Sequence, residues 1–192
     1  MPEDVDVRVK CTAHHEAGHI VIAAAQELRL RSEGLMVDAL GEGLACYCKQ
    51  PDKSDLSRER VIVATLAGFR AEKRFREESS YPARDELEVI GSGDWREART
   101  LLMGLPGEYF SNKRRLADRL EHLIERHWLP IKALAAALLA KNPERVKPLK
   151  SGVPWALEKT AKYVIGQEVI GILAQHGIAA VCDPDCELWV SG

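Results

Sequence analysis

Two histidines four residues apart, inside a helix-forming apolar segment, constrain this chain more than any other feature of its sequence. Between about Thr12 and Leu30 apolar residues recur at helical spacing, namely Ala17, Ile20, Val21, Ala24 and Leu28. The same segment contains the motif HEAGH, which places His15 and His19 about 40° apart around a helix axis. Both imidazoles then face the same side of the helix, where they can bind one metal ion.

Glu16 follows the first of these histidines directly. At that offset its carboxylate lies beside a bound metal ion, where it can take a proton from water and deliver it to a leaving amine. The three residues therefore predict a metal-dependent hydrolase. The alternative is a chance grouping on a helix surface, because the pattern is short.

The remaining sequence predicts a mainly helical fold with one small β-hairpin, in a single domain over residues 1–192. The hairpin is expected at residues 34–49, where two short runs flank a Gly-Glu-Gly turn. Residues 5–11 are ambiguous, since Val5, Val7, Val9 and Cys11 alternate as in a strand. The expected helices, with a break at Pro130, cover residues 55–75, 94–102, 111–128, 131–139 and 154–177.

Composition excludes several classes of protein. The 27 Lys and Arg residues are balanced by 29 Asp and Glu, which argues against nucleic acid as a partner. The sequence has no apolar run long enough to cross a membrane, and its acidic N-terminus does not resemble a secretory signal, so we expect a cytoplasmic protein. Five cysteines without framework spacing are then expected to be reduced thiols. Their spacing also disfavours a four-thiolate zinc site formed by Cys46, Cys48, Cys182 and Cys186.

Three motifs, taken in order, resemble the peptidase domain of the FtsH-type proteases. They are HEAGH followed by Ile20, an AG-x-x-AE pattern over residues 67–72, and SGD-x-x-x-A over residues 92–98. Weaker similarity at 133–139 and 165–173 extends the resemblance over most of the chain. The resemblance implies a mainly helical, zincin-like metallopeptidase domain, with zinc on His15, His19 and Asp94 and with Glu16 as the general base.

The third metal ligand needs its own argument, because a catalytic zinc has three protein ligands and an open fourth position. Glu72 fits those zincins that use a glutamate from a second helix, whereas Asp94 begins a helix behind a glycine-containing turn. We favour Asp94 and expect Glu72 to orient a ligand histidine. An ordinary helix N-cap is the alternative role for Asp94.

The sequence also departs from the FtsH-type pattern. It contains no phosphate-binding motif G-x-x-x-x-G-K-[ST] and has Trp95 where the family usually has leucine. We therefore expect ATP-independent hydrolysis of polypeptides, with an extended substrate added to the edge of the 34–49 hairpin. A homo-oligomer and a separate ATPase partner are both compatible with the sequence. The alternative is a non-catalytic zinc-binding interaction domain with the same fold. The missing ATPase module favours this alternative, whereas the presence of Glu16 favours the peptidase.

Overall fold

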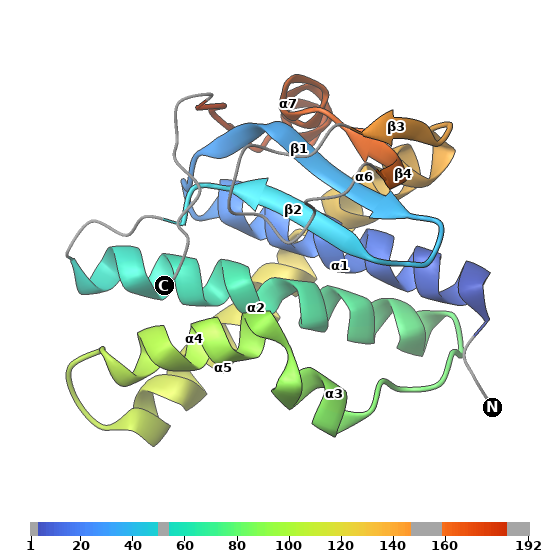
Figure 1. The fold of residues 1–192 in the computed structure, drawn as a ribbon. Helices are drawn as coiled ribbons and strands as arrows, with labels where there is room; N and C mark the ends of the chain where they lie inside the picture. The colour runs from blue at the N-terminus through green and yellow to red at the C-terminus, as the bar shows by residue number, and fades with distance from the viewer. Residues whose placement is uncertain (1–3, 50–53, 147–158, 184–192) are drawn as a thin grey trace.

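The computed structural model of the chain describes residues 4–49, 54–146 and 159–183. Within these ranges it is mainly helical with a small four-stranded antiparallel sheet (Figure 1), which confirms the predicted class. The elements in chain order are α1 (Val5–Ala25), β1 (Leu30–Asp38), β2 (Gly43–Tyr47), α2 (Asp55–Glu78), α3 (Glu86–Gly91), α4 (Gly93–Met103), α5 (Tyr109–Arg126), α6 (Trp128–Ala140), β3 (Glu144–Val146), β4 (Lys159–Val164) and α7 (Gly166–Gln175).

The sheet is larger than the single hairpin that the sequence predicted. Its strands lie in the order β2-β1-β4-β3, and the expected hairpin forms β1 and β2. The second pair comes from β3 and β4, and Leu35 of β1 lies between Ala45 of β2 and Val164 of β4. The helix expected over 154–177 is therefore wrong for residues 159–164, since α7 begins only at Gly166; its first residues, 154–158, lie outside the described residues.

Helix α1 lies at the centre of the molecule and carries HEAGH. Figure 1 shows the sheet on one side of α1 and helix α2 on another, and its residues from Cys11 to Ala24 are nearly all buried. The buried residues include the polar side chains of the HEAGH motif as well as the apolar ones. The helix begins at Val5, because the Asp4 side chain accepts a hydrogen bond from the Asp6 backbone N–H at 2.9 Å. The strand-like alternation over 5–11 therefore does not form a strand.

Gly18 allows α1 and α2 to pack closely. A Cβ atom at this position would lie 2.6 Å from the Cβ of Ala71 and 2.8 Å from the carbonyl oxygen of Ala67. Both contacts are shorter than side chains tolerate, so only glycine fits between the helices at this distance. Close helix packing thus offsets the intrinsic cost of glycine in a helix.

The other helices follow their sequence signals more closely. The chain breaks between α5 and α6 at His127, three residues before the expected break at Pro130. Pro130 falls in the first turn of α6, where its missing N–H leaves no intrahelical bond unmade. Gly177, at φ +71°, ends the turn after α7, as predicted for a helix stop. None of the helices in the described ranges combines the length and apolar character needed to cross a bilayer.

Candidate metal centre

Three potential metal ligands converge from two helices. His15 and His19 lie on α1, and Asp94 lies in the first turn of α4. The Nε2 atoms of both histidines lie 3.3 Å from Oδ2 of Asp94, and the three ligand atoms are all within 4.8 Å of one another. Both imidazoles are buried and Asp94 is partly exposed. The structure therefore brings together the three residues that the sequence selected, in a group that could hold a metal ion.

Hydrogen bonds on the opposite side of each ring orient the two histidines. Nδ1 of His19 donates to the backbone oxygen of Ala64 at 2.8 Å, and Nδ1 of His15 donates to Oε2 of Glu72 at 3.1 Å. With a proton on Nδ1, each ring presents the lone pair of Nε2. Partners of this kind fix the tautomer and direction of metal-binding histidines.

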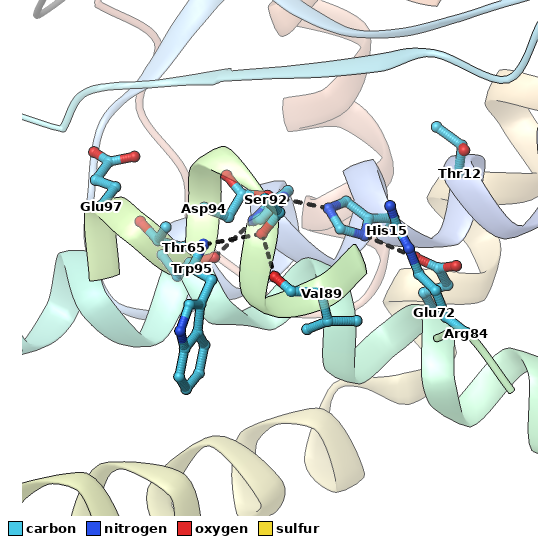
Figure 2. Close-up of polar contacts among 12 residues, drawn as sticks. Thr12, His15, Thr65, Glu72, Arg84, Val89, Ser92, Asp94, Trp95 and Glu97 are labelled. Carbon is cyan, nitrogen blue, oxygen red and sulfur yellow. Dashed lines mark hydrogen bonds and ion pairs between the residues drawn. The ribbon is translucent and has the colours of Figure 1, made fainter. Parts of the chain in front are cut away.

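Asp94 does not cap its own helix. Ser92 performs that role, since its Oγ accepts a hydrogen bond from the Trp95 backbone N–H at 3.2 Å and donates to the Val89 oxygen at 2.7 Å (Figure 2). The Asp94 carboxylate is consequently directed toward the histidines. Burial opposes its ionisation, but the facing His19 and His15 outweigh burial and hold the pKa of Asp94 well below its usual range.

Glu72 lies behind His15, on the side away from Asp94 (Figure 2). Its other contacts are with arginines: Nε of Arg76 donates to Oε1 at 2.9 Å, and Nη1 of Arg84 donates to Oε2 at 3.2 Å. Burial alone would raise the pKa of Glu72, but His15 and the two arginines outweigh it and lower the pKa to about 2. This geometry matches the expected orienting role of Glu72.

The donor set is one that divalent metal ions, including zinc, accept, and two of its three ligand-atom spacings match those of a tetrahedral ion. Ligand atoms about 2.05 Å from a tetrahedral ion are about 3.3 Å apart, the separation that both Nε2–Oδ2 pairs show. Burial would lower the pKa of His15, but Asp94 and Glu72 raise it to about 10, so without a metal ion His15 holds a second proton on Nε2 that a bound metal ion would displace. Two imidazoles and one carboxylate form a typical ligand set for catalytic zinc, though other divalent metals accept it.

Gly68 on α2 makes room for the converging histidines. A Cβ atom there would lie 2.4 Å from Nε2 of His19 and 2.5 Å from Nε2 of His15. Any side chain at this position would therefore clash with the Nε2 atoms of both histidines. The AG-x-x-AE pattern thus supplies both this gap, at Gly68, and the hydrogen-bond partner of His15, at Glu72.

Glu16 lines a small pocket beside the ligands. The pocket has a volume of about 130 Å³ and is bordered by Glu16, His19, Asp94, Lys49 and four residues of β2, namely Gly43, Leu44, Ala45 and Tyr47. Burial raises the pKa of the Glu16 carboxyl, and the neighbouring His15 and His19 offset only part of this effect. Among the described residues its carboxylate has no hydrogen-bond partner, so it is free to accept a proton from a group in the pocket.

Several contacts around the site were not visible in the sequence. Lys49 extends into the pocket and pairs with Glu97 of α4, with 2.7 Å between Nζ and Oε2. Tyr47 hydrogen-bonds to Thr65 across the β2–α2 interface at 3.1 Å. The Arg76 contact with Glu72 has a signal in the sequence, because residues four apart on a helix are neighbours. The approach of Arg84 and Lys49 depends on tertiary packing.

Of the residues expected to lie outside the metal site, His14 and three cysteines match the prediction and Cys48 does not. His14 is a packing residue as predicted, since its ring stacks on Phe75 with centroids 3.7 Å apart. Cys11, Cys46 and Cys182 are free thiols, in line with the expectation, whereas Cys48 is disulfide-bonded, which corrects the prediction that all five cysteines are reduced. Cys186 lies outside the described residues, and the disfavoured four-cysteine zinc site is not tested.

Comparison with known proteins does not add to this geometry. The sequence matches no protein-family model and no curated protein.

Replacing Asp94 and Glu72 one at a time distinguishes the metal ligand from the residue that orients His15. We expect Asp94→Asn to lower zinc affinity more than Glu72→Gln does, because an amide is a poor zinc ligand while loss of an orienting partner costs about 10- to 100-fold. Competition with a chromogenic chelator measures both affinities. Circular dichroism is the control for folding, since Glu72→Gln leaves the buried Arg76 without its partner carboxylate. The reverse order of affinities would identify Glu72 as the ligand.

Proposed function

We propose that this protein is a zinc-dependent metallopeptidase with a helical, zincin-like domain similar to the peptidase domain of FtsH-type proteases. One observation carries the proposal: the Nε2 atoms of His15 and His19 both lie 3.3 Å from Oδ2 of Asp94, and Glu16 borders the same pocket as His19 and Asp94. An ion-binding site without catalysis needs the three ligands but has no use for a buried carboxylate beside them. The pairing of ligands with an adjacent base is what peptide hydrolysis by water requires.

The chain's own residues divide the chemistry between them. His15, His19 and Asp94 would hold zinc, and Glu72 and the Ala64 carbonyl orient the two imidazoles. When bound in such a site, zinc polarises a carbonyl and makes water a nucleophile near neutral pH. Glu16 accepts the proton of the attacking water and transfers it to the nitrogen of the leaving amine. No covalent bond between enzyme and substrate is needed.

The position of strand β2 favours an extended polypeptide as the substrate. It lies at the edge of the sheet, pairs only with β1 among the described residues, and borders the pocket that contains Glu16. An edge strand offers unpaired backbone groups, to which an extended chain can add as a further strand. We expect such pairing to place a scissile peptide bond beside Glu16. Unfolded polypeptides are thus better substrates than folded proteins.

Cleavage of unfolded polypeptides tests the proposal directly. Zinc-loaded protein is incubated with a panel of unfolded chains, without ATP, and the products are identified by mass spectrometry. We expect cleavage that stops when a chelator removes the metal and returns when zinc is restored, because zinc supplies the activated water. Zinc binding without cleavage of any substrate in the panel would favour the alternative, an interaction domain that retains the metal site.

A further inference from the structure

A second hollow in the molecule lies away from the metal site, between helices α3, α4 and α5. This α3–α5 groove has a volume of about 570 Å³. Its apolar lining includes Ile90 of α3, Trp95 and Met103 of α4, and Phe110 of α5. The size is within the range of sites that hold a ligand or a few side chains of a partner.

The apolar residues of the groove are unusually exposed. Three apolar residues that line the groove are more than half exposed: Ile90 at 53%, Met103 at 67% and Phe110 at 70%. Large apolar residues scattered singly on a surface need no explanation, but residues gathered around one hollow mark interaction surfaces. These three line the same groove, so covering them would remove apolar area from water at one place.

The charges of the groove define the partner. Arg99 and Lys113 border it, and the lining residues that the structure describes include no Asp or Glu. The Lys113 ammonium lies 5.5 Å from the centre of the Trp95 ring, which holds it over the apolar surface. Within the described ranges, neither Arg99 nor Lys113 forms an ion pair with a carboxylate. A partner that offers apolar side chains flanked by carboxylates would satisfy both features of the groove.

The groove and the metal site lie on different faces of α4. Asp94 and Trp95 are consecutive, and consecutive residues point about 100° apart around a helix. Figure 2 shows Asp94 in contact with His15 and the Trp95 indole directed away from them. A partner in the groove would therefore leave the pocket of Glu16 open, while contacting the helix that carries Asp94.

We propose that the α3–α5 groove binds an acidic amphipathic segment of a partner protein. Apolar side chains of the segment cover Trp95, Met103 and Phe110, and its carboxylates pair with Arg99 and Lys113. An amphipathic helix laid into a groove is a recurrent mode of peptide recognition, with apolar anchors on one face. This binding is separate from the proposed hydrolysis and does not depend on it.

A synthetic peptide pair tests the charge and the apolar surface together. The probe is a short fluorescein-labelled helical peptide with Leu and Phe on one face and Glu on the other; its control has Lys at every Glu position. Binding to the full chain is followed by fluorescence anisotropy, and mass spectrometry checks that the probe stays intact. We expect the Glu peptide to bind at least about 10-fold more tightly than the Lys peptide, and salt to weaken it.

Variants of the protein locate the binding. Phe110→Glu should weaken the Glu peptide at least about 10-fold, whereas Leu129→Glu, an equally exposed position on α6 at 68%, should not change it. The double variant Arg99→Glu/Lys113→Glu should reverse the preference toward the Lys peptide. Circular dichroism confirms that the variants fold.

Three results of the peptide-binding experiments would overturn the proposal. They are absence of binding by the Glu peptide, equal binding of the two peptides, and equal loss in Phe110→Glu and Leu129→Glu. A dimer in sedimentation velocity that disappears in Phe110→Glu would also overturn it, because a second copy of this chain would then cover the groove.

Discussion

Glu16→Gln is expected to lower cleavage of an unfolded polypeptide by at least about 100-fold while leaving zinc bound, because general acid–base catalysis contributes about 10² to 10⁴-fold. Glutamine keeps the shape of the side chain but cannot accept the proton of the attacking water. The two histidines and Asp94 are unchanged, and the carboxylate of Glu16 is not part of the ligand group. Cleavage rate and zinc content are measured on the same protein preparation.

A second glutamate provides the matched control for this experiment. Glu27 lies just beyond the same helix, on the surface and paired with Arg60, so Glu27→Gln should leave cleavage unchanged. Equal cleavage by wild type and Glu16→Gln would contradict the assigned base and would point to a contaminating protease. Loss of zinc in Glu16→Gln would instead show that the carboxylate supports metal binding.

The helical half of the site could be predicted because its geometry is local. Helix spacing alone places His15 and His19 on one face, and the position of Glu16 follows from the same spacing. Asp94 lies 79 residues from His15, so no local rule could select it over Glu72. The resemblance to FtsH-type peptidases favoured Asp94, and in the structure Ser92 takes over the capping of α4.

The contacts that hold the ligands in place could not be predicted in the same way. Arg84 reaches Glu72 from the segment before α3, and Gly68 faces both histidines only because α2 packs against α1 at close range. Such contacts depend on how helices distant in sequence approach each other. Glycine at positions 18 and 68 permits a close approach, but the sequence does not show which groups approach.

The sheet shows the same limit for the fold. Strands β1 and β2 are joined by a short turn, and their alternation and turn residues predicted the hairpin. Strand β4 pairs with β1 from more than 120 residues away, as in the pair Leu35–Val164. Only Ile165 separates this strand from α7, and the signals at Pro154 and Gly177 predict one helix across both. Strand identity here is decided by the partner strand.

His15→Ala and His19→Ala are each expected to remove zinc from a protein that otherwise carries about one ion per chain, because each leaves only two protein ligands. The affinity should fall by more than the about 10- to 100-fold that loss of an orienting partner costs. Elemental analysis after dialysis against a weak chelator measures the content. His14→Ala is the matched control, since His14 is a buried neighbour that stacks on Phe75 and does not face the ligand group.

Thermal unfolding gives an independent measurement of the same site. A metal that binds only the folded state stabilises it by about 2.7 kcal/mol at 100 times its Kd, so added zinc should raise the Tm of wild type and of His14→Ala. The Tm of His15→Ala and the Tm of His19→Ala should not rise at the same zinc concentration. If all four proteins keep the same zinc content and the same zinc-dependent Tm, the metal binds elsewhere, and the free cysteines Cys11, Cys46 and Cys182 become the next candidates. A response lost in both ligand variants but retained in His14→Ala would place the ion between His15 and His19, because only those substitutions remove an Nε2 that faces Asp94.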